Sequence, residues 1–60
     1  MKTMFAVEID NRHGRCYAME GGWTTANAKN AFLLTSREAI EHFAKQFTGK
    51  NPKVVEVKIK

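Results

Sequence analysis

The stretch TSREAIEHFAKQF, residues 35–47, decides the fold because it holds the clearest helix signal in the chain. Thr35 and Glu38 have the spacing of a capping box, in which Thr35 caps the first turn and Glu38 reaches back to the backbone of Thr35. Gly49 suits the left-handed position that ends a helix, and Pro52 prevents the helix from resuming. Behind the cap, one stripe of the helix is apolar and the rest is polar; the apolar stripe is Ala39, Ile40, Phe43, Ala44 and Phe47.

Residues 4–10 alternate between apolar and polar side chains, which predicts a half-buried strand with Phe5, Val7 and Ile9 on its core face. A second strand follows through a tight hairpin. A three-residue loop, Arg12-His13-Gly14, would give Gly14 the positive φ that such a loop needs and turn Tyr17 and Met19 toward the core. A four-residue loop would instead turn Cys16 and Ala18 inward, because a slip of one residue reverses every side chain. We favour the three-residue loop, with Tyr17 and Met19 inward.

Two more strands complete the expected sheet. Residues 31–35, AFLLT, read as a short third strand, and residues 53–60 alternate again with Val55, Val57 and Ile59 inward. A strand, helix, strand connection makes the last strand parallel to the third, and hence to the first. We expect one α+β domain over residues 1–60, a small three- to four-stranded, mostly antiparallel sheet with one helix on one face and strand order 3-2-1-4. Pairing of the last strand beside the third is the alternative.

Composition narrows the functional classes. Sixty residues form a small core, and a single cysteine rules out an internal disulfide, so a homodimer would supplement stability. The net charge of +4 favours solubility and some attraction to polyanions. The sequence does not predict a signal peptide or an apolar run long enough to span a membrane, and a single thiol suits a reducing compartment. We expect a soluble, cytoplasmic protein that does not bind a membrane.

The residues that carry chemistry do not form a catalytic pattern. His13 and Cys16 have no second pair of ligands with the spacing of a zinc site. Cys16 lacks a neighbouring base, and Glu8 and Glu20 would lie on a sheet face without a cleft that could perturb their pKa values. No glycine-rich phosphate loop joins a strand to a helix. We therefore predict that the chain is not an enzyme and uses no metal or other cofactor.

Trp23 is the only tryptophan and follows two glycines in a polar connector. We expect its indole to close the bottom of the core over Phe5 and Phe47; the alternative is an exposed anchor for a partner, since tryptophan is enriched at the energetic centres of interfaces. Lysines are expected near it, which gives a candidate binding surface of Trp23, Lys2, Lys29, Lys50 and Lys53. The other basic residues are expected at the hairpin end of the sheet: Arg12, His13, Arg15, Arg37 and Lys60.

The sheet face without a helix is the second candidate surface. It is expected to be flat and partly apolar, which suits a protein partner or a second copy of the chain. Its residues would be Ala6, Glu8, Cys16, Ala18, Glu20, Val54, Glu56 and Lys58.

The pattern GGWT…A…F…T..EA resembles that of small accessory proteins carried by phages and other mobile elements. Trp23, Thr24, Ala31, Phe32, Glu38 and Ala39 carry the resemblance. It implies a binding protein that in some cases inhibits a host or defence enzyme. The sequence therefore predicts a non-enzymatic binding module for a protein target, with a small basic nucleic-acid-binding protein as the alternative.

Overall fold

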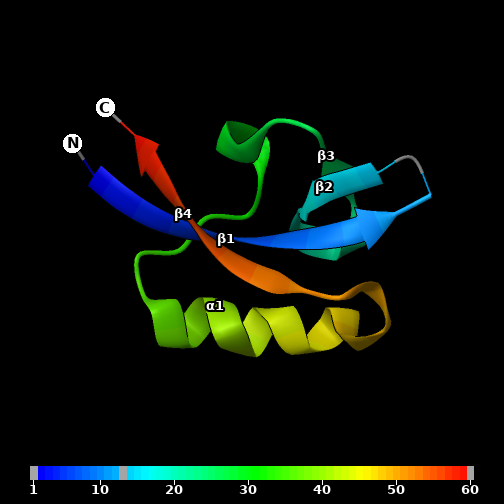
Figure 1. Cartoon of the computed structure of the whole chain (residues 1–60). Coiled ribbons are helices and arrows are strands. Elements are labelled where there is room, and N and C mark those ends of the chain that lie inside the picture. Colours follow the sequence, from blue (N-terminus) through cyan, green and yellow to red (C-terminus); the bar gives the residue numbers. More distant parts are fainter. Residues whose placement is uncertain (1, 13, 60) are drawn as a thin grey trace.

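Four strands form one sheet in the order β3-β2-β1-β4, with one helix packed on it (Figure 1). The fold class and the strand order predicted from sequence are therefore confirmed. The computed structural model describes residues 2–12 and 14–59. Along the chain, the elements are β1 (Lys2–Asn11), β2 (Gly14–Ala18), the 3-10 turn η1 (Glu20–Gly22), β3 (Thr24–Thr25), the 3-10 turn η2 (Ala28–Asn30), α1 (Arg37–Ala44), the 3-10 segment η3 (Lys45–Lys50) and β4 (Lys53–Ile59).

The hairpin between β1 and β2 has a tighter register than predicted. Asn11 pairs with Gly14, which leaves a two-residue loop of Arg12 and His13. His13 lies outside the described residues. Gly14 does have a positive φ, of 118°. Ile9 pairs with Cys16, so Cys16 and Ala18 point to the core and the predicted inward orientation of Tyr17 and Met19 is wrong. Small side chains fit beneath the closely packed helix, whereas Tyr17 is accommodated on the other face.

The predicted third strand is also displaced along the chain. Residues 31–35 form no strand, and only Leu34 makes an isolated bridge, to Phe5. The strand beside β2 is instead β3, where Thr24 pairs with Ala18 and Thr25 with Tyr17. Residues 26–36 then carry the chain across the sheet to the start of α1 (Figure 1).

The helix begins one residue later than the capping box predicts. Ser36 is the N-cap, and its hydroxyl oxygen accepts a hydrogen bond from the backbone N–H of Ala39 at 3.3 Å. The helix tightens into η3 after Ala44, and the left-handed residue at its end is Asn51 with a φ of 51°, not Gly49. Pro52 follows at once, so the chain reverses there and enters β4.

β4 runs antiparallel to β1, which corrects the predicted parallel direction. α1 runs in the same direction as β1, and the turn at Asn51 and Pro52 sends the chain back along the sheet (Figure 1). Val54 therefore lies opposite Val7 and packs against the core, while Val55 lies opposite Ala6 on the other face. The prediction that Val55, Val57 and Ile59 point to the helix is wrong for this reason.

The core lies between α1 and the sheet. Its buried members are Val7, Ile9, Cys16, Ala18, Ile40 and Ala44. Three phenylalanines close its side: the ring centroids of Phe32 and Phe43 are 4.5 Å apart, and those of Phe43 and Phe47 are 5.3 Å apart.

The other face of the sheet is covered in part as well. Ala6 is fully buried and Val57 is buried, although both point away from α1. The segment with η2 contacts β4 and lies on the side of the sheet opposite α1 (Figure 1). The sheet is therefore a middle layer, with α1 on one side and the segment that carries η2 on the other.

Candidate binding surface at Trp23

Trp23 stands at the end of the five-residue loop that joins β2 to β3. Glu20, Gly21 and Gly22 form the turn, and the backbone N–H of Met19 donates to the carbonyl oxygen of Trp23 at 2.7 Å, closing the loop. Gly21 and Gly22 have φ values of 81° and 87°, which glycine adopts without the steric penalty of other residues. The two glycines thus allow the chain to reverse sharply before the tryptophan.

The indole of Trp23 faces solvent. The residue is 72% exposed and is the only large hydrophobic residue with this degree of exposure in residues 2–12 and 14–59. Its expected position as a lid over Phe5 and Phe47 is wrong: Trp23 is absent from the core and from the partly buried side chains packed against it, which include Phe32. One edge of the indole lies against Gly21, where a Cβ atom would be 3.5 Å from the Trp23 Cδ1 atom.

The four lysines expected around Trp23 are spread over the molecule. Lys2 pairs with Ile59 and Lys53 lies opposite Glu8, so the two lysines are separated by about 20 Å along β1, at ~3.3 Å per residue. Trp23 precedes β3, at the sheet edge opposite β4, and three strand spacings separate these edges by about 14 Å. Lys29 lies in η2 and Lys50 ends η3.

The second basic group is also divided. Arg37 begins α1 at the end of the sheet where β1 begins, away from the hairpin that carries Arg12 and Arg15 (Figure 1). His13 and Lys60 lie outside the described residues. The basic side chains in the described part of the chain therefore do not form the single stripe that is typical of a nucleic-acid-binding face.

The open sheet face expected from sequence is not present as a continuous surface. Ala6, Cys16 and Ala18 are buried, the last two beneath α1. Glu56 lies opposite Phe5 and Lys58 opposite Thr3, so both point to the helix side of the exposed strand β4. Glu8 keeps its predicted face, and Glu20 belongs to η1. Val54 packs against the core.

An ion cluster occupies part of the face opposite α1. The Arg15 guanidinium donates from Nε to Glu8 Oε1 at 2.7 Å and from Nη1 to Asp10 Oδ1 at 2.5 Å. The hydrogen bond to Glu8, with the charges of Asp10 and Glu8, raises the pKa of Arg15 above its ordinary value. Asn51 Nδ2 also donates to Asp10 Oδ2 at 3.0 Å and connects the turn before β4 to the hairpin. Arg15 is therefore already neutralised by carboxylates and is poorly suited to bind a phosphate.

A depression of about 520 Å³ adjoins this cluster. It is lined by Asp10, Arg15, Thr48, Asn51, Pro52 and Lys53. Because its Arg15, Asp10 and Asn51 side chains already bind one another, the depression presents few unpaired groups to a ligand.

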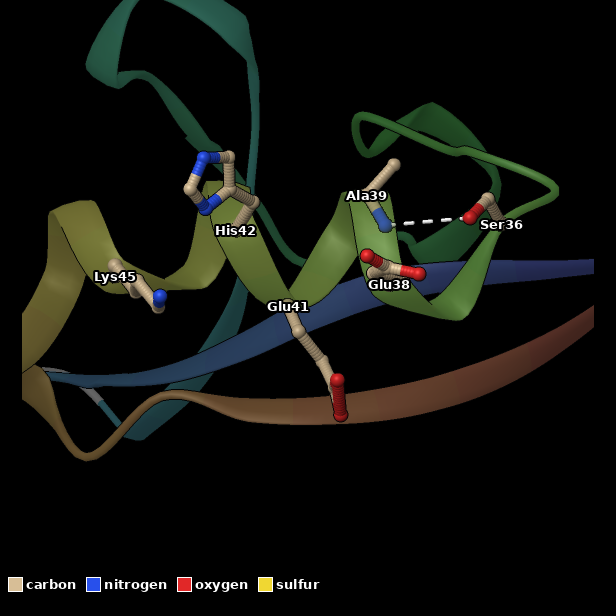
Figure 2. A pocket seen from close by; sticks show the side chains of 6 residues that line it. All are labelled: Ser36, Glu38, Ala39, Glu41, His42 and Lys45. Carbon is tan, nitrogen blue, oxygen red and sulfur yellow. Dashed lines mark hydrogen bonds between the residues drawn. The ribbon is translucent and has the colours of Figure 1, made fainter.

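The outer surface of α1 holds a second open depression, also of about 520 Å³ (Figure 2). Its side chains project in different directions: His42 and Glu41 point to opposite sides of the helix, and Ser36 is engaged with the N–H of Ala39. Arg37 Nε lies 3.6 Å from Glu41 Oε2, an ion pair between residues four apart on the helix. The lining residues are Ser36, Glu38, Ala39, Glu41, His42 and Lys45. This surface is a solvated helix face of mixed charge.

In residues 2–12 and 14–59, no three His, Cys, Asp or Glu side chains converge as metal ligands would. In the same residues, no helix has the length and apolar character needed to cross a membrane. Comparison with known proteins finds no family model, no curated protein and no solved structure that matches the chain.

Proposed function

We propose that this chain is a non-enzymatic binding module that recognises a protein target through Trp23. The observation that carries the proposal is the 72% exposure of the indole. A tryptophan so placed keeps a large apolar surface in water, which a partner would remove from water. Tryptophan is among the residues that most often dominate the energy of protein interfaces.

The loop also holds Trp23 in a defined position before any partner arrives. The hydrogen bond from the Met19 N–H to the Trp23 carbonyl oxygen closes the loop, and the indole lies beside Gly21, where an added Cβ atom would be 3.5 Å from Cδ1. β3 follows directly and pairs with β2. An anchor that is already ordered loses less conformational entropy on binding than a flexible one. This supports recognition of a protein pocket into which the indole inserts.

The resemblance to accessory proteins of phages and mobile elements supports a host or defence enzyme as the target, with inhibition as the consequence of binding. Two residues that carry the resemblance, Trp23 and Thr24, lie at the exposed end of the loop between β2 and β3. We place this binding in the cytoplasm, where a single unpaired cysteine is common.

The alternative, nucleic-acid binding, depends on lysines gathered around Trp23. The separation of Lys2 from Lys53 and the neutralisation of Arg15 give it less support. The two functions differ in salt dependence, because contacts to phosphates release counterions and weaken steeply as salt is added.

A comparison of variants tests the proposal. Immobilised wild-type protein, Trp23→Ala and the control Lys45→Ala are exposed to a lysate of cells that carry the gene, at low and high salt. Trp23→Ala should change the free energy of unfolding by no more than about 0.5 kcal/mol, as expected for an exposed side chain, and should lose a protein that the other two retain. Binding of that protein should shift the tryptophan emission to shorter wavelength.

Capture of the same proteins by Trp23→Ala and wild type would refute recognition through Trp23. Capture of nucleic acid that disappears at high salt would favour the alternative function.

A further inference from the structure

β4 forms a long exposed edge of the sheet. It pairs with β1 over Lys53–Ile59, and no other segment in residues 2–12 and 14–59 pairs with its outer side. The strand at the other edge, β3, has only two residues. An unpaired edge of this length presents a row of backbone N–H and C=O groups that a further strand can bind.

The pairing of Phe5 identifies which groups face outward. The backbone N–H and C=O of Phe5 both bond to Leu34, on the side of β1 away from β4. Glu56 lies opposite Phe5, so its own N–H and C=O point away from β1. By alternation, Val54, Glu56 and Lys58 offer the outward donors and acceptors of β4.

We propose that β4 pairs antiparallel with β4 of a second copy of the chain, in the register centred on Val57. Hydrogen bonding requires the outward residues to lie opposite one another, and among the two-fold centres that meet this condition, those at Val55, Glu56 and Val57 align at least five residues of β4 with the second copy. A centre at Glu56 or Lys58 sets like charges directly opposite, which is unfavourable. A centre at Val55 sets Lys53 opposite Val57 and Glu56 opposite Val54, so it forms no pair of opposite charges across the interface.

Over residues 55–59, the register centred on Val57 sets complementary side chains opposite one another. It sets Glu56 opposite Lys58 of the second copy, and Lys58 opposite Glu56 of the second copy. Both residues are exposed, and neither forms an ion pair within the described part of one chain. The register thus forms two opposite-charge pairs across the interface, which is the arrangement that stabilises antiparallel strands.

The same register matches the apolar side chains of β4. Val57 faces Val57 of the second copy in a pair without backbone hydrogen bonds, where side chains approach most closely. Val55 faces Ile59 of the second copy, and both are half-buried in the single chain. The result is one continuous sheet across two molecules. It supplements the small core of a 60-residue chain that has one cysteine and hence no internal disulfide.

Sedimentation of the wild-type protein at concentrations up to about 1 mM tests the pairing, since this range reveals millimolar dissociation constants. We expect a concentration-dependent dimer. In either single variant, Glu56→Lys or Lys58→Glu, residues 56 and 58 carry the same charge and face one another in both pairs across the interface. Each substitution should raise the dissociation constant of the dimer at least about tenfold. Both residues are exposed, so both variants should retain the wild-type circular dichroism.

Two matched controls separate charge pairing from a general loss of folding. The double variant Glu56→Lys/Lys58→Glu restores opposite charges across the interface and should dimerise like the wild type. A mixture of the two single variants should form heterodimers, because one variant then has lysine at both positions and the other has glutamate at both. In the wild type at high protein concentration, dimer formation should slow hydrogen exchange at the backbone N–H groups of Glu56 and Lys58.

A wild-type protein that stays monomeric at about 1 mM would overturn the proposal, and the charges of β4 would then protect the edge from pairing. A dimer that persists in both single variants, or one without protection of Glu56 and Lys58, would place the interface elsewhere. The proposal does not rest on the function of Trp23, and Trp23→Ala should leave the dimer unchanged.

Discussion

Gly21 holds a backbone conformation that an alanine would strain. Its φ is 81°, and an added Cβ atom would be 3.5 Å from the Trp23 Cδ1 atom, an ordinary contact distance. Gly21→Ala should therefore strain the backbone without causing a clash. We expect the substitution to lower the free energy of unfolding by about 1 kcal/mol. Urea denaturation of the two proteins measures the difference.

Gly49→Ala is the matched control. Gly49 lacks a positive φ, and a Cβ atom there would meet no other atom within 4 Å. Its substitution should leave stability unchanged or raise it slightly, because alanine restricts the unfolded chain. Equal effects at the two positions would contradict the strained turn at Gly21.

Trp23 shows what a single residue type can and cannot predict. Large apolar side chains are usually buried, so a core position was a reasonable expectation for the only tryptophan. In the structure the indole is exposed, and Phe32 packs beside the core with its ring centroid 4.5 Å from that of Phe43. Because residues 31–35 have no regular period in the structure, their contact with the helix could not be inferred from alternation.

At the scale of the helix, Ser36 is the residue to test. Its hydroxyl oxygen accepts from the N–H of Ala39, and Thr35 makes no such bond within the described chain. Ser36→Ala should lower the free energy of unfolding by about 1 kcal/mol. In a domain of this size that is a fall of several degrees in melting temperature. Thr35→Ala should melt close to the wild type. The reverse ranking would show that the capping box of Thr35 and Glu38 forms after all.

The elements differ in how far their sequences predict them. α1 and β1 have a clear apolar period, and both form where the pattern indicates. The hairpin register depends on one residue of loop length, and that choice decides whether Cys16 or Tyr17 faces the helix. Thr24–Thr25 is too short for alternation to reveal, so β3 could not be identified before the structure. The predicted direction of β4 is wrong because it depends on a third strand at residues 31–35, which do not form one.

At the scale of the whole molecule, the sequence pattern did not predict that a chain segment packs on the sheet face opposite α1. A sheet with one helix was expected to leave its other face open. The segment that carries η2 crosses that face, which explains the burial of Ala6 and Val57. It also explains why β4 has apolar residues on both sides, Val54 toward α1 and Val55 away from it. The Trp23 loop and the edge of β4 then remain as surfaces for partners.

The accessibility of Cys16 reports on the whole fold. The residue is 8% exposed and lies in the core with Ile40 and Ala44, and its Sγ accepts a hydrogen bond from Asn11 Nδ2 at 3.3 Å. A thiol reagent should therefore label the native protein far more slowly than the unfolded chain. Rapid labelling would have been expected in the register that the sequence predicted, because that register places Cys16 on the sheet face without a helix.

The route by which Cys16 becomes accessible can be tested with the cap variant. If labelling requires global unfolding, Ser36→Ala should accelerate it about fivefold, the change in the unfolded population that ~1 kcal/mol produces. Ser36 lies at the start of α1, whereas Cys16 lies on β2, so a local opening of the hairpin would leave the rate unchanged. Labelling rates in dilute protein, measured for both chains in the native state and in urea, distinguish these routes. Native labelling as fast as in urea would place Cys16 outside the core and return the hairpin to the register in which Tyr17 faces the helix.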